Sequence, residues 1–102
     1  VLILGSGNVV HNLAKVNWNM TGGYSWAEDF DGYIKTRVLN HQDDDVIHYE
    51  RAGSSAYYAF PTPDHYAPLL YALGARAQED TVAVFNDECV LGSLSMTSYR
   101  FG

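Results

Sequence analysis

The sequence predicts an α/β domain, and three features of its 102 residues indicate this. An apolar run, Val1–Leu4, ends at Gly5-Ser6-Gly7, which is typical of a strand buried on both faces, as in a parallel sheet. Helical periodicity follows in the middle of the chain, and β-branched residues with turn signals return near its end. The order of strand, helices and hairpin predicts an α/β layer whose sheet needs more strands than this chain supplies.

Composition limits the classes of function. The hydrophobic share is 47%, which is enough for an ordered core. Six basic and 12 acidic residues give a net charge of −6, which disfavours nucleic acids and anionic membranes as partners. No apolar run is long enough to span a bilayer. The single cysteine, Cys89, excludes an internal disulfide and suits a reducing, cytoplasmic location. Because the chain opens without Met in an apparent strand, we expect further residues upstream.

Three helices are expected. Ser25 and Glu28 match a capping box before a helix over about 26–40, whose buried stripe contains Trp26, Phe30, Tyr33, Ile34 and Val38. A second helix is expected over about 45–59, capped by Asp43-Asp44-Asp45 and weak at Gly53. Thr62-Pro63 begins a third helix, in which Pro68 requires a later start or a bend.

The last quarter of the chain is expected to be β structure. Residues 81–85 form a strand, and residues 89–101 form a longer strand or a strand pair with a possible bulge at Gly92. On the edge of this region, Cys89 is expected to be a buried small hydrophobe rather than a nucleophile.

The Gly5-Ser6-Gly7 turn has three interpretations. It resembles the start of a dinucleotide fingerprint, but Val10 stands where the third glycine belongs and no acidic residue follows at the right distance. It also suits a tight turn in which glycine adopts positive φ. In the third interpretation, the glycines let the chain turn sharply and present His11 just beyond the strand.

Two of the four histidines are candidate metal ligands. His11 follows the expected strand, and His65 lies in the first turn of a helix, whose positive end disfavours the protonated imidazole. For each of them, a half-exposed surface histidine is the alternative. His41 and His48 lie beside three aspartates, and a solvated polar face is the expected reading there.

Two segments resemble one family. Gly5-Ser6-Gly7-Asn8-Val9-Val10-His11-Asn12-Leu13 resembles an active-site segment of the class III extradiol ring-cleavage dioxygenases, in the DOPA 4,5-dioxygenase branch of the LigB-like superfamily. Pro61-Thr62-Pro63-Asp64-His65-Tyr66-Ala67-Pro68-Leu69-Leu70-Tyr71 resembles that branch's second downstream histidine segment. Gly92-Ser93-Leu94-Ser95-Met96 resembles its closing strand.

The resemblance implies that residues 1–102 are the C-terminal portion of one extradiol dioxygenase domain with a central, mostly parallel sheet flanked by helices. It implies a metal-dependent enzyme, with Fe(II) or Zn(II), that opens a catechol such as DOPA with O₂. His65 matches a metal ligand. His11 matches the other site histidine, which contacts the metal or acts as an acid/base. The family's two other histidines belong to an N-terminal portion that this sequence does not contain, so the fragment alone is expected to be inactive.

Two alternatives stay open. One is an α/β nucleotide- or phosphate-binding module that uses Gly5–Gly7. The other is a non-catalytic metal-binding fragment that shares His11 and His65 but lacks turnover.

Overall fold

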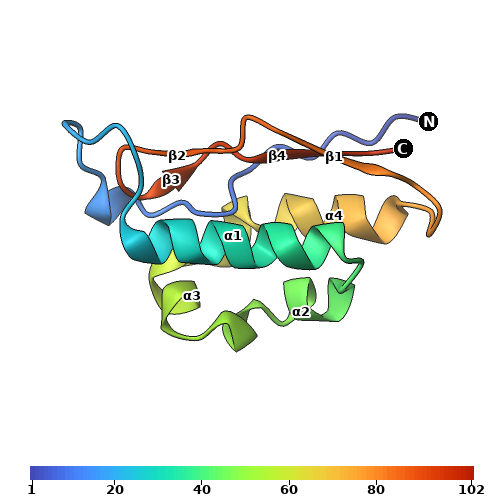
Figure 1. Cartoon of the computed structure of the whole chain (residues 1–102), viewed down its shortest axis with the longest axis horizontal. Coiled ribbons are helices and arrows are strands. Elements are labelled where there is room, and N and C mark those ends of the chain that lie inside the picture. The colour runs from blue at the N-terminus through green and yellow to red at the C-terminus, as the bar shows by residue number, and fades with distance from the viewer.

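The chain folds in three layers in a computed structural model that describes residues 1–102 (Figure 1). Four strands and the extended N-terminal segment form one layer, α1 and α4 form the middle one, and α2 and α3 form the third. The helices are α1 (Ser25–Leu39), α2 (Asp43–Ile47), α3 (Ser54–Ala59) and α4 (Ala67–Ala75). The strands are β1 (Val82–Phe85), β2 (Cys89–Val90), β3 (Leu94–Ser95) and β4 (Ser98–Phe101).

The α/β class is confirmed, but the central parallel sheet is not. β1 pairs with β4 in antiparallel register, with Val82 opposite Phe101. β2 pairs with β3, also antiparallel, with Cys89 opposite Ser95. The short loop between β2 and β3 reverses the chain, and because this hairpin lies between β1 and β4, those two strands also run in opposite directions.

The buried strand expected at Val1–Leu4 is wrong for this chain. The segment is extended but belongs to neither sheet, and no main-chain hydrogen bond holds it. Leu2 and Leu4 are 90% and 88% exposed. A parallel strand needs a hydrogen-bonded neighbour, and no strand of this chain pairs with it. The segment instead borders a groove of about 550 Å³ that α4 and β4 also line.

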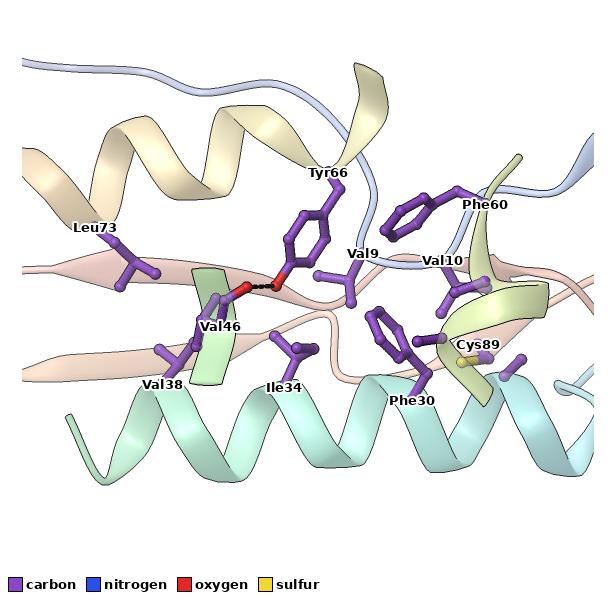
Figure 2. Packing of buried hydrophobic residues seen from close by; sticks show 13 residues of the cluster. Val9, Val10, Phe30, Ile34, Val38, Val46, Phe60, Tyr66, Leu73 and Cys89 are labelled. Atoms are coloured by element: carbon purple, nitrogen blue, oxygen red, sulfur yellow. Dashed lines mark hydrogen bonds between the residues drawn. The ribbon is translucent and has the colours of Figure 1, made fainter. Parts of the chain in front are cut away.

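The first helix is confirmed, and its apolar stripe packs as its spacing predicts. Phe30, Ile34 and Val38 are fully buried and point from α1 into the core (Figure 2). They face Tyr66, from the turn before α4, and Val46 of α2. The Tyr66 hydroxyl donates to the Val46 carbonyl oxygen at 2.6 Å, which links these two elements across the core.

The capping box at the start of this helix is wrong in detail. Ser25 is already the first helical residue, and Tyr24 occupies the N-cap position without a side-chain hydrogen bond. The Glu28 carboxylate instead accepts from the main-chain N–H of Gly23 at 3.3 Å. The helix therefore begins one residue earlier than the capping box requires.

The helix expected over 45–59 is divided into α2, a 3₁₀ turn at Tyr49–Ala52, and α3. Gly53 lies at the second break with φ +90°, as its weak helix propensity suggested. The first break lies at His48, where ψ is 60°. The two breaks let α2 and α3 each pack against α1.

Pro68 causes no bend in the third helix, because it occupies the second residue of α4, where no intrahelical amide bond is lost. A separate 3₁₀ turn, Pro63–His65, precedes the helix and carries His65. The expected strand over 81–85 is confirmed as β1, and the β-rich end is confirmed as β2–β4. No helix combines the length and the apolar character that crossing a bilayer requires.

Candidate functional site

Hydrogen bonds hold the segment Asn8–Asn12 on two sides. Along one edge, the Ser95 N–H donates to the Val10 carbonyl at 3.0 Å, and the Asn12 N–H donates to Ser93 at 3.1 Å. Along the other edge, the His11 N–H donates to the carbonyl of Ala59, at the end of α3, at 2.8 Å. The segment bends at Val9 and Val10 and contains no helix before the 3₁₀ turn at Leu13–Lys15, and hydrogen bonds on both edges fix the position of the His11 main chain.

Gly5 and Gly7 let the main chain pass close to neighbouring main chain, and neither glycine forms an unusual turn. Neither has positive φ, so the tight-turn interpretation is wrong. A Cβ on Gly7 would lie 2.1 Å from the His65 carbonyl oxygen, and one on Gly5 would lie 2.9 Å from that of Pro68. Only glycine lets the segment before His11 run this close to the turn that carries His65.

The nucleotide-binding alternative has no support in this geometry. A dinucleotide site needs the glycine loop to open into a helix, whose N-terminus receives the phosphates. Here, a bend at Val9 and Val10 follows Gly7 in place of a helix, and the Asn8 N–H is already bonded to the carbonyl of His65 at 2.7 Å.

The structure brings the two candidate histidines together. The imidazole rings of His11 and His65 are stacked, with centroids 3.6 Å apart and planes 10° from parallel. His11 is half-buried and His65 is exposed, so the pair is open to solvent on one side. Their exposure agrees with the alternative of surface histidines, and the assignment of both residues as metal ligands stays a prediction.

The surroundings of His11 favour its neutral form. Burial lowers the pKa of His11, and a positive charge on His65 lowers this pKa further. A neutral ring is the form that binds a metal ion or accepts a proton.

The pair meets only part of what a metal centre needs. Imidazole nitrogen suits both iron and zinc. A catalytic site normally takes three protein ligands, however, and no third His, Cys, Asp or Glu side chain joins the two histidines. Because each ring nitrogen directs its lone pair within the ring plane, two parallel rings must also turn before both can bind one ion.

The other two histidines lie apart from this pair. His41 follows the C-terminus of α1 and His48 follows α2, and both are exposed, as a solvated polar face predicts. The nearest charged partner of His48 is Glu50, at 3.4 Å. Cys89 is buried, as expected, and burial raises the pKa of its thiol to about 12.

The sequence did not point to the polar residues whose hydrogen bonds hold the segments of the site in place. Asp31 is 4% exposed and accepts hydrogen bonds from the hydroxyls of Ser95 and Thr97. A signal for this residue existed, because Asp31 falls on the stripe of α1 between the buried Ala27 and Ile34. Asn8 and Asn12 gave no comparable signal, since their partners are main-chain carbonyls from distant segments.

Comparison with known proteins adds to this geometry. No family model matches the chain. It is 36% identical to "4,5-DOPA dioxygenase extradiol" of Escherichia coli (strain K12), a match that covers 100% of this chain and 39% of that protein. Proteins of the same name from Beta vulgaris and Portulaca grandiflora are 31% and 29% identical, and each match covers 99% of this chain and 38% of the relative.

A solved structure has the same fold. The crystal structure of an uncharacterized protein from Escherichia coli K12 superposes with a TM-score of 0.85 at 36% identity, covering 95% of this chain and 41% of that one. Over its whole length this α/β chain is similar in sequence to proteins named as DOPA-type extradiol dioxygenases, and it spans only 38–39% of the length of these curated relatives.

Proposed function

We propose that His11 and His65 are part of the metal site of an enzyme that opens a catechol ring, with DOPA as the representative substrate, by extradiol cleavage with O₂. The proximity of the two imidazoles, whose centroids lie 3.6 Å apart, is the observation that carries this proposal. The names of the relatives support the same reaction class. The cation is Fe(II) for turnover, and Zn(II) is an expected occupant of purified protein, since imidazole sites bind zinc more tightly than iron.

The remaining ligands are proposed to come from outside these 102 residues, in an N-terminal portion of the same domain. The relatives are more than twice as long as this chain, which leaves room for such a portion. The same portion is proposed to supply the strands of a central parallel sheet, with residues 1–102 as the C-terminal part of the domain. The one cysteine, which is buried, fits a cytoplasmic location.

In this mechanism, His65 holds the cation and His11 moves protons. The bound cation supplies electron transfer between the catechol ring and O₂. His11, kept neutral by its surroundings, accepts a proton from a catechol hydroxyl and returns it as the ring opens. Both atoms of O₂ are incorporated into the product, which carries an aldehyde and a carboxylic acid and is of the muconic semialdehyde type. The hydrogen bond from the His11 main-chain N–H to the Ala59 carbonyl holds the backbone that carries this imidazole during proton transfer.

A second candidate function is a non-catalytic metal-binding fragment. The observation that favours it is the donor count, because two imidazoles alone fall short of a catalytic ligand set. It predicts bound metal without turnover.

Reconstitution tests the proposal. The native polypeptide that carries this sequence is loaded anaerobically with Fe(II) and given DOPA and O₂, and the yellow ring-fission product is followed by absorbance. His65→Ala is expected to lose metal and turnover together, whereas His11→Ala is expected to lose more turnover than metal. His48→Ala, at an exposed histidine, serves as the control. Equal metal content in wild type and His65→Ala contradicts the ligand assignment, and bound iron without turnover favours the second candidate.

A further inference from the structure

We propose that Asn8 is a positioning residue that sets the spacing between the His11 and His65 imidazoles. The importance of this spacing for metal binding rests on the function proposed above, but the spacing itself can be measured without metal. Asn8 precedes His11 by three residues on the same segment, and it is the residue whose N–H is bonded to the carbonyl of His65.

Two hydrogen bonds at Asn8 join three parts of the fold. Its main-chain N–H donates to the His65 carbonyl at 2.7 Å. Its side-chain Nδ2 donates to the carbonyl of Ser95, in β3, also at 2.7 Å. Asn8 therefore bridges the turn that carries His65 and the strand that supports the His11 segment.

The β3 end of this bridge is firmly held. Ser95 is 1% exposed, and its hydroxyl donates to the buried carboxylate of Asp31 in α1. The Ser95 N–H also holds the carbonyl of Val10, next to His11. A bond from Asn8 to Ser95 thus fixes the segment against a rigid support, and the glycine at position 7 leaves the neighbouring main chain free to approach His65.

The chemistry of this position requires a short side chain with an N–H donor, because the partner is a carbonyl oxygen. Aspartate has the same shape, but it removes the donor and places a negative charge against that oxygen. Asn8→Asp is therefore expected to break the side-chain bond and displace the segment, although the main-chain N–H of residue 8 is retained. Without the Ser95 anchor, this N–H no longer fixes the distance between the two rings.

The first measurement uses the metal-free full chain. Stacked rings shift each other's ring protons upfield in NMR spectra, so the carbon-bound ring protons of His11 and His65 report the stacking directly. Asn8→Asp is expected to lose most of this shift. Asn19→Asp is the matched control, since Asn19 is exposed and its side chain makes no hydrogen bond. It is expected to keep the wild-type shifts.

The second measurement is a zinc titration against a competing chelator. Asn8→Asp is expected to bind Zn(II) about tenfold more weakly than wild type, which corresponds to one lost hydrogen bond. If wild type binds no zinc, the proposed function fails, while the ring-proton shifts still decide the role of Asn8. Should Asn8→Asp not fold, Asn8→Ala removes the same donor without adding charge. Unchanged ring-proton shifts in whichever variant folds overturn the proposal.

Discussion

The main chain of Gly7 passes so close to His65 that a Cβ at position 7 would lie 2.1 Å from the His65 carbonyl oxygen. The neighbouring residue, Asn8, donates its N–H to that same oxygen. The contact is made by backbone on both sides, so no side-chain rotation can relieve it. Gly7 is thus what allows the two histidine segments to meet.

Gly7→Ala is therefore expected to destabilise the fold by about 1–3 kcal/mol, the usual cost of forcing extra volume into a packed site. It should also reduce the ring stacking of His11 and His65. Urea unfolding measures the first effect and ring-proton shifts measure the second. Gly32→Ala is the control, because Gly32 lies within α1 with open space around it, and alanine there should be neutral or stabilising. A fully stable, fully stacked Gly7→Ala would contradict the close approach.

Tyr66→Phe is expected to cost about 1–3 kcal/mol of unfolding free energy, because it leaves the Val46 carbonyl without its partner inside the core. Burial also raises the pKa of the Tyr66 phenol, so its hydroxyl stays a donor across the accessible pH range. Chemical denaturation measures the loss. Tyr71→Phe, at an exposed ring of α4, should change stability by less than about 0.5 kcal/mol. Equal effects of the two substitutions would show that the hydroxyl of Tyr66 contributes nothing specific.

Asp31 is expected to make stability depend on pH. Burial raises the pKa of this carboxyl, and the hydroxyls of Ser95 and Thr97 counteract only part of that rise. The folded state therefore holds the proton more tightly than the unfolded chain does. The contribution of this group to stability is full below its ordinary pKa, near 4, and is lost as the pH rises through the higher folded value.

Asp31→Asn removes this titration. Its unfolding free energy relative to wild type should increase steadily from pH 4 toward neutral pH, as measured by urea unfolding at several pH values. Asp29→Asn, two residues earlier at an exposed position of α1, serves as the control for the change of an aspartate to asparagine. A difference for Asp31→Asn that does not change with pH would mean that burial leaves this carboxyl unperturbed.

Local patterns predicted a good part of the fold. The stripe of Phe30, Ile34 and Val38 repeats at the period of a helix, so these residues alone define a helix and its buried face. The break at Gly53 was also predictable, because glycine favours the positive φ found there. The break at His48 was not, since nothing in its local sequence disfavours a helix.

The candidate site was predicted only in outline. His11 and His65 could be proposed from their positions and from the family resemblance, while the interpretation of Gly7 as a glycine with positive φ was wrong. The close approach that Gly7 allows involves a residue far along the chain, and so does the bond from Asn8 to Ser95. The spacing of residues along the sequence does not predict such contacts between distant segments.

The sequence by itself determined the helix α1, the β-rich end and the two histidines worth attention, because each depends on residues close together along the chain. Only the tertiary structure decided that these two imidazoles stack, that Val1–Leu4 lacks a strand partner, and that Asp31 supports β3. The physical reason is that main-chain hydrogen bonds and glycine contacts between distant segments form only after the core has brought those segments together.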